Sequence, residues 1–203
     1  MNRPADIVIP SCKPREALAE LIAEIEASTA GGPKVLATCR DACAAANRNA
    51  GLGLVETPNV IMVDDDVTGF PEGWNITLEA ALDENPNALM VGANLVNADG
   101  SLAPMLGWPS GREGDGLLEV KNRELCTACV CLRETGLRFD EAYEGSGWED
   151  TDFAAQLRAA FPDGVWLCHA GLRVVHKNEK KNQGGETFNR NRARYRAKWG
   201  RET

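Results

Sequence analysis

The sequence predicts a single α/β domain built on a mixed, mostly parallel sheet that is flanked by helices. Three observations lead to this fold class. Apolar, β-branched runs alternate with amphipathic helical patterns through the first half of the chain, an order that favours parallel strands and right-handed crossovers. The chain has 203 residues, enough for one large domain with its own core. Its composition, 43% hydrophobic and 26% charged, is that of an ordinary globular protein.

Each predicted element of the first half rests on the spacing of its apolar residues and on residues that typically end a helix or strand. The first predicted helix places Leu18, Leu21 and Ile25 on one face. Gly51 ends the second helix. In chain order, the predicted elements are the strand Asp6–Pro10, the helix Pro14–Ser28, the strand Lys34–Thr38, the helix Asp41–Ala50, a strand that starts at Asn59, the helix Trp74–Asp83 and the strand Ala88–Asn94.

The second half is less regular, and it opens with a glycine-rich stretch from Asp99 to Gly116. The elements predicted after that stretch are the apolar strand Leu125–Leu132, the helix Thr151–Phe161, and two strands, Val165–Cys168 and Leu172–Val175. No repeat or low-complexity linker divides the chain, so we expect one domain over residues 1–203.

Three consecutive carboxylates, Asp64, Asp65 and Asp66, follow the buried run that starts at Asn59. Two like charges about 4 Å apart repel by roughly 4 kcal/mol at an effective dielectric constant near 20, so a packed acidic cluster needs a cation. In an open α/β sheet, ligands bind at the carboxyl ends of strands, and carboxylate oxygens suit Mg²⁺ or Mn²⁺. The alternative is a solvated acidic turn before Gly69.

Composition and charge argue against several classes of protein. No apolar stretch approaches the roughly 20 residues that a membrane span needs, and no signal-peptide core follows Met1, so we expect a cytoplasmic protein without a membrane partner. The net charge of −8 argues against non-specific affinity for nucleic acid. Seven cysteines, mostly inside apolar runs, indicate reduced thiols rather than a disulfide framework.

The cysteines allow one competing hypothesis. Cys126 and Cys129 have a C-x-x-C spacing and could join Cys39 and Cys43 on zinc. The same segment also reads as a buried strand, in which a free cysteine behaves as a small hydrophobic residue, and we favour that interpretation.

Several motifs follow one another in a characteristic order. They are Val8-Ile9-Pro10-Ser11, Asn47-Arg48-Asn49-Ala50-Gly51, Val63-Asp64-Asp65-Asp66, Phe139-Asp140-Glu141, Gly147-Trp148-Glu149-Asp150-Thr151-Asp152-Phe153 and Val175-His176. Over nearly the whole chain, this ordered set resembles family 2 glycosyltransferases of the GT-A fold, a Rossmann-like fold. The resemblance implies an inverting transfer of a sugar from a nucleotide diphosphate donor, usually a UDP-sugar, with Mn²⁺ or Mg²⁺ on the diphosphate.

The chain departs from the family at its second strand. The run Ala37-Thr38-Cys39-Arg40-Asp41 replaces the aspartates that help to hold the base, so the base remains open. The resemblance further implies that residues 1–98 bind the nucleotide sugar. Residues 99–203 would then bind the acceptor and perform catalysis.

The resemblance also assigns the metal ligands. Asp66 would ligate the metal directly, whereas Asp64 and Asp65 would bind ribose or orient the metal through its outer ligands. His176 would be a third ligand, although a lone histidine is more often structural.

Three further residues are candidates for donor binding. Arg48 could hold the diphosphate with its fork of donors, or it could form a surface ion pair on its helix. Pro10 and Ser11 end the first strand, where a nucleoside can dock against the backbone; an ordinary strand-to-helix turn explains them equally well.

Inversion needs one carboxylate to deprotonate the acceptor, and Asp150 is our candidate. Local sequence alone favours a helix cap at this position, and the motif order reverses that preference. Glu149 is the alternative base. Trp148 could stack against a sugar, although most such tryptophans are simply packed in the core.

The end of the chain is strongly basic and holds Lys177, Lys180, Lys181, Arg190, Arg192, Arg194, Arg196, Lys198 and Arg201. It could close over the donor phosphates, contact an anionic acceptor, or form a solvated helix that docks through Phe188, Tyr195 and Trp199.

Two function classes therefore remain. The first is a metal-dependent glycosyltransferase with a soluble hydroxyl acceptor. Hydroxymethylated pyrimidine in phage-type DNA is a second candidate acceptor, which would place the protein in a bacterial or phage-infected host cell. The other class is a non-catalytic or hydrolytic nucleotide-sugar-binding domain. The oligomeric state is open.

Overall fold

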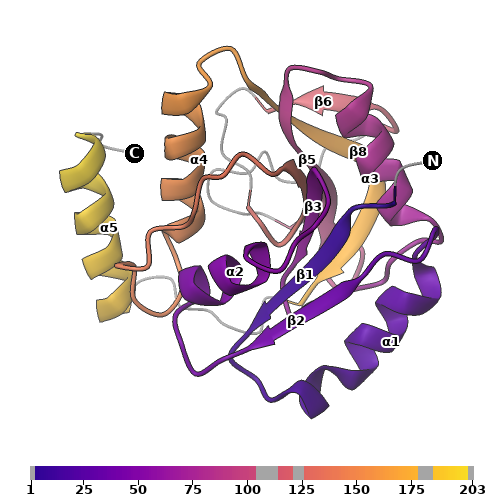
Figure 1. The fold of residues 1–203 in the computed structure, drawn as a ribbon, viewed down its shortest axis with the longest axis horizontal. Coiled ribbons are helices and arrows are strands. Elements are labelled where there is room, and N and C mark those ends of the chain that lie inside the picture. Colours follow the sequence, from indigo (N-terminus) through magenta and orange to yellow (C-terminus); the bar gives the residue numbers. More distant parts are fainter. Residues whose placement is uncertain (1–2, 104–113, 121–125, 178–184, 201–203) are drawn as a thin grey trace.

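The structure, a computed structural model, describes residues 3–103, 114–120, 126–177 and 185–200. Its strands are β1 (Asp6–Ser11), β2 (Val35–Cys39), β3 (Asn59–Val63), β4 (Val67–Thr68), β5 (Ala88–Val96), β6 (Leu117–Glu119), β7 (Cys129–Arg133) and β8 (Val165–His176). Its helices are the 3-10 helix η1 (Arg15–Leu18), α1 (Ala19–Ser28), α2 (Ala44–Leu52), α3 (Trp74–Asp83), α4 (Glu149–Ala160) and α5 (Glu186–Trp199). Figure 1 shows their arrangement.

All the strands in the described ranges belong to one eight-stranded sheet with the order β2-β1-β3-β7-β5-β8-β4, and β6 pairs with β8 outside this path. Strand β1 is parallel to β2 and β3, and β5 is parallel to β8 over the longest register in the sheet. Strand β7 lies between β3 and β5 and is antiparallel to both. The predicted mixed α/β sheet is confirmed, with antiparallel pairing wherever β4, β6 or β7 takes part.

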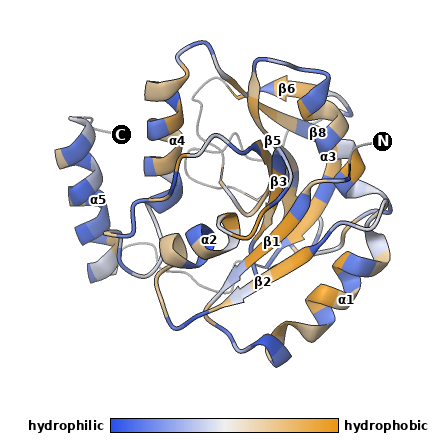
Figure 2. Cartoon of the chain, viewed as in Figure 1, coloured by the Kyte–Doolittle hydropathy of each residue, from blue (hydrophilic) through white to orange (hydrophobic). Residues whose placement is uncertain are grey.

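Helices cover both faces of the sheet. Successive strand residues point to opposite faces, and the central strands carry apolar side chains on both, so each face needs a layer of helices to bury it. Ile7 and Ile9 of β1 belong to the core that includes residues of α1 and α3, whereas Val8 belongs to the core that includes residues of α2 and α4. Figure 2 shows the apolar central strands and the mostly hydrophilic α5, which lies outside α4. Strand β3 lies inside the sheet between β1 and β7, and the three aspartates follow its last residue, Val63.

Several element boundaries differ from the prediction for local reasons. Helix α2 begins at Ala44 rather than near Asp41, because Cys43 is its N-cap and the Cys43 thiol accepts a hydrogen bond from the Ala46 N–H at 3.4 Å. The two predicted strands Val165–Cys168 and Leu172–Val175 form one long strand, β8. Its pairing with β5 shifts register between Ala93 and Asn94.

The structure does not support the zinc hypothesis. All seven cysteines are free, and Cys129 and Cys131 are buried in the core on β7. Burial raises the pKa of the Cys129 thiol, which disfavours a thiolate ligand. Within the described ranges, the side chains that could hold a metal include no cysteine. In the same ranges, no helix combines the length and apolarity needed to cross a membrane.

Candidate functional site

The three consecutive aspartates after β3 contact different partners. The Asp64 carboxylate accepts a hydrogen bond from Arg48 at 2.9 Å. Asp65 accepts a hydrogen bond from the Ser11 hydroxyl and lies 3.5 Å from the Lys13 ammonium. Asp66 contacts His176. Asp65 therefore contacts residues from the end of β1, whereas Asp64 and Asp66 contact Arg48 and His176.

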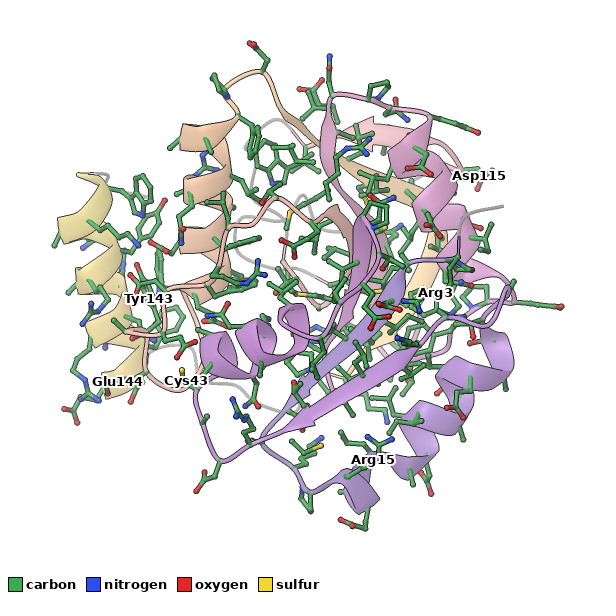
Figure 3. All side chains as sticks on the ribbon, viewed as in Figure 1. Arg3, Arg15, Cys43, Asp115, Tyr143 and Glu144 are labelled. Carbon is green, nitrogen blue, oxygen red and sulfur yellow. The ribbon has the colours of Figure 1, made fainter. Side chains whose placement is uncertain are left out.

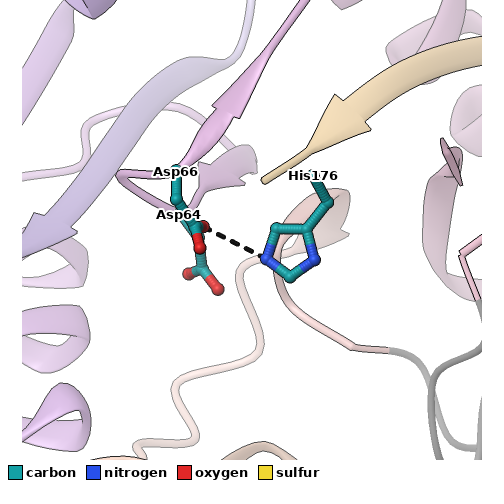
Figure 4. A group of neighbouring side chains, drawn as sticks. All are labelled: Asp64, Asp66 and His176. Atoms are coloured by element: carbon teal, nitrogen blue, oxygen red, sulfur yellow. Dashed lines mark ion pairs between the residues drawn. The ribbon is translucent and has the colours of Figure 1, made fainter. Parts of the chain in front are cut away.

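Asp64, Asp66 and His176 form a group that could hold a metal ion, since their ligand atoms all lie within 4.8 Å of one another. The His176 Nε2 atom is 3.1 Å from an Asp66 oxygen. The dashed line in Figure 4 marks this contact. Strands β4 and β8 create this proximity, because Val67 pairs with His176 and the Lys177 N–H donates to the Asp66 carbonyl at 2.9 Å. Two carboxylates and one imidazole fit Mn²⁺ better than Mg²⁺, which prefers oxygen ligands.

Local electrostatics favour a cation at this position. Burial raises the pKa of Asp64, although Arg48 opposes the shift. Burial opposes charging of His176, but the hydrogen bond and charge of Asp66 still raise the pKa of the imidazole. A metal requires a neutral imidazole and ionised carboxylates, so metal binding would release protons from this cluster.

Arg48 joins the acidic strand end to the start of α4. Arg48 is 5% exposed, and its guanidinium donates to Glu149 at 2.6 Å and to Asp64 at 2.9 Å. It also lies over the Phe139 ring, 5.4 Å from the centroid. Gly51 lets α2 lie close to β1, because a Cβ at this position would collide with the Val8 side chain.

The environment of Arg48 alters the role expected from the sequence. Burial disfavours its charged form, yet Asp64 and Glu149 raise the pKa of the guanidinium above its ordinary value. The group is therefore a buried cation held between two carboxylates, and direct diphosphate binding is not the role that its contacts favour. The alternative that the sequence allowed, a surface ion pair of Arg48, is also excluded, because Arg48 is buried.

Replacement of Arg48 by methionine should destabilise the fold by about 3–5 kcal/mol, because it leaves the buried Glu149 charge without its partner. For a chain of this size, that loss lowers the melting temperature by roughly 10 °C, which thermal denaturation can measure. The double variant Arg48→Met/Glu149→Leu should recover part of the loss. A cost below about 1 kcal/mol for the single variant is typical of a surface pair and would contradict this account.

Helix α4 begins at Glu149, directly after a tight loop. Gly145 and Gly147 have φ values of 59° and 103°, and Trp148 has a φ of 76°, which is rare for a bulky residue. Trp148 is the N-cap of α4 and makes no side-chain cap hydrogen bond. The Asp150 carboxylate instead accepts from the N–H of Thr151 at 2.8 Å, so Asp150 is not the cap that local sequence alone favoured.

Asp150 and Glu149 differ in their availability for proton transfer. Glu149 is 4% exposed and paired with Arg48. Burial and the neighbouring charge of Glu149 raise the pKa of Asp150 to about 7, and Arg48 opposes the shift. A carboxylate that titrates near neutral pH is suited to a general base.

Trp148, at the start of α4, packs against side chains of α5. Its ring centroid is 5.7 Å from that of Phe188 and 5.3 Å from that of Tyr195. The Arg192 guanidinium lies 6.0 Å from the indole centroid. These contacts favour the packing role that the sequence left open for Trp148.

Helix α5 contacts the body through aromatic and charged side chains. Tyr195 is fully buried, and Trp199 donates to Asp152 at 2.7 Å. Arg190 pairs with Glu144, and Lys198 pairs with Asp140 and Asp152. A shallow hollow beside α5 is lined by Ala142, Glu144, Arg190, Asn191, Ala193, Arg194, Ala197 and Lys198, none of which belongs to the acidic strand end. Lys180, Lys181 and Arg201 of the basic segment lie outside the described residues.

The last two donor-binding candidates lie side by side at the end of β1, and the structure adds Lys13 to the candidate site. Pro10 and Ser11 are buried at the end of β1, next to Thr38 and Cys39 of β2. Lys13 was not predicted, although it contributes a positive charge beside Asp65. Lys13 reaches the acidic turn because β1, which precedes it, pairs in parallel with β3. No local sequence pattern identifies Lys13 as a site residue.

Comparison with known proteins supports the fold assignment. No protein-family model and no curated protein matches the chain. The solved structure of GalNAc-T7 with UDP, GalNAc and Mn²⁺ is similar over 98% of this chain and 48% of its own, with a TM-score of 0.62 and 14% sequence identity. The chain thus spans about half the length of that protein. The likeness confirms a GT-A-like fold, and it does not single out family 2.

Proposed function

We propose that this chain is a metal-dependent glycosyltransferase that moves a sugar from a nucleotide diphosphate donor, of the UDP-sugar type, to a hydroxyl acceptor with inversion. The observation that carries this proposal is the group of Asp64, Asp66 and His176, whose ligand atoms lie within 4.8 Å of one another at the end of β3. Support also comes from the shared fold, because the similar GalNAc-T7 structure contains UDP and Mn²⁺.

In this proposal, Asp66 and His176 hold the ion directly and Asp64 completes the group. When bound, Mn²⁺ or Mg²⁺ would neutralise charge on the diphosphate leaving group. Arg48 fixes the orientation of Asp64, because the two side chains share a 2.9 Å ion pair. An arginine placed in this way resembles the outer partners that orient metal ligands in other proteins.

The nucleoside would lie on the side of the acidic turn that faces β1. There the Ser11 hydroxyl and the Asp65 carboxylate are hydrogen-bonded and can exchange that bond for the hydroxyls of a ribose. Lys13 is partly exposed, and its ammonium lies 3.5 Å from Asp65, where it can attract a phosphate. Residues 1–98 would therefore supply most of the donor contacts.

Asp150, from the second half of the chain, would act as the general base toward the acceptor hydroxyl. Its position on the first turn of α4 is supported by the loop before it, and its pKa of about 7 is suited to proton transfer near neutral pH. Glu149 is a weaker candidate because Arg48 engages its carboxylate at 2.6 Å.

The acceptor is proposed only as a hydroxyl compound. A DNA acceptor would favour unpaired cations along the basic segment, but Arg190 and Lys198 are engaged by acidic side chains. These ion pairs give the DNA acceptor less support than the sequence alone suggested.

A panel of nucleotides and nucleotide sugars, screened by thermal shift with and without Mn²⁺, tests this function. We expect UDP or a related nucleotide to raise the melting temperature in Mn²⁺, because a ligand at 100 times its Kd adds about 2.7 kcal/mol of stability. Excess EDTA should remove the shift. The absence of any metal-dependent shift across the panel would count against a nucleotide-sugar site.

A further inference from the structure

The loop that leads into α4 is fastened at both ends by one buried side chain from α5. Asn191 is 2% exposed. Its carbonyl oxygen accepts from the Glu144 N–H at 3.1 Å, and its amide nitrogen donates to the carbonyls of Glu144 and Gly147 at 2.8 and 2.9 Å. A single side chain thereby satisfies three backbone groups of one short loop, and it does so across 44 to 47 positions of sequence.

The held loop has an unusual conformation. Gly145, Gly147 and Trp148 all have positive φ values, and Trp148 is the one non-glycine residue among the described residues with such a value. A bulky residue in this region is strained, so it persists only where its surroundings hold it. The Asn191 bond to the Gly147 carbonyl and the packing of Trp148 against Phe188 and Tyr195 provide that support.

Helix α5 is itself anchored to the first turns of α4. Asp152 is fully buried and accepts hydrogen bonds from Trp199 at 2.7 Å, from Lys198 at 3.0 Å and from Tyr143 at 3.1 Å. Figure 3 shows Tyr143 and Glu144 on the segment beside α5. Asp152 lies two residues after Asp150, so the same helix turn carries both the anchor and the proposed base.

We propose that Asn191 is a positioning residue, which fixes the Glu144–Gly147 loop and through it sets the position of Asp150. This inference rests on the proposed function, because it gives α5 a role in the reaction of Asp150. Asn191 has no direct contact with the acidic strand end among its hydrogen bonds in the described structure, so its influence passes through the loop backbone. Small displacements of a reacting group have large effects on rate, on the order of 100-fold for about 1 Å.

The test compares Asn191→Ala with the wild type in three measurements on the full chain. We expect kcat for sugar transfer to fall by about 10- to 100-fold, while the calorimetric Kd for UDP with Mn²⁺ stays within about twofold. Backbone amides of residues 144–151 should exchange hydrogen faster, and amides of the central strands should not change. Asn87→Ala is the matched control, since Asn87 is an exposed asparagine in the turn before β5, and it should leave all three measurements unchanged.

A second variant covers the case in which Asn191→Ala does not fold. Asn191→Ser keeps one hydroxyl donor, and we expect an intermediate loss of kcat with the same unchanged Kd. Faster loop exchange without loss of kcat would overturn the positioning role, as would unchanged exchange and unchanged kcat. A wild-type protein that binds UDP with Mn²⁺ but transfers no sugar would instead overturn the catalytic part of the proposed function, and the positioning role with it.

Discussion

Replacement of Asp66 by alanine is expected to abolish the gain in UDP affinity that Mn²⁺ gives the wild-type protein. The substitution removes a carboxylate from the group of possible ligands and deprives His176 of its partner at 3.1 Å. Loss of an outer partner alone typically lowers metal affinity by about 10- to 100-fold, so loss of a direct ligand should cost at least as much. Isothermal titration of UDP in Mn²⁺ and in EDTA measures the effect.

Asp163→Ala is a matched control for this experiment. Asp163 is exposed and lies two residues before β8 begins, whereas His176 is the last residue of that strand, so the two are at opposite ends of β8. The control should therefore keep the full Mn²⁺ dependence of UDP binding. If Asp66→Ala also keeps it, the metal is held elsewhere and the three-residue group is only an internal ion pair.

The acidic turn could be predicted from sequence because its signal is local. An apolar, β-branched run defines β3, and the carboxyl end of such a strand lies at the ligand-binding edge of an α/β sheet. The position of His176 at the end of another apolar run is equally local. The closeness of His176 to the acidic turn has no local signal, because it depends on the antiparallel pairing of the two-residue strand β4 with β8.

The polar contacts around the proposed base could not be predicted. Arg48 and Glu149 are 101 residues apart, and the sequence predicts Arg48 within a helix and Glu149 just before one, with no sign that the two meet. Asn191 likewise gives no signal in the sequence, since an asparagine within a basic helix is typical of a solvated face. Their burial follows from the packing of α2, α4 and α5, which local periodicity does not specify.

Asp150→Asn should abolish most sugar transfer and leave donor binding nearly unchanged. The amide keeps the size of the side chain and an oxygen that can accept from the Thr151 N–H, but it cannot take a proton from the acceptor. Removal of a general base typically costs about 10²- to 10⁴-fold in rate. Steady-state kinetics with a donor identified by the thermal-shift panel, together with the Kd for UDP, separates the two effects.

The pH dependence gives an independent reading of the same residue. Since burial and Glu149 raise the pKa of Asp150 to about 7, kcat/KM of the wild type should rise with pH through that value and level off above it. The ordinary pKa of the group is 3.8, so ionisation of Asp150 lowers the stability of the fold between pH 3.8 and about 7, and Asp150→Asn should escape this loss. A folded Asp150→Asn protein with near-normal transfer would remove Asp150 from the role of base. Glu149→Gln, compared at equal stability, would then be the decisive variant, because Glu149 is the one other carboxylate that the first turn of α4 presents beside Arg48.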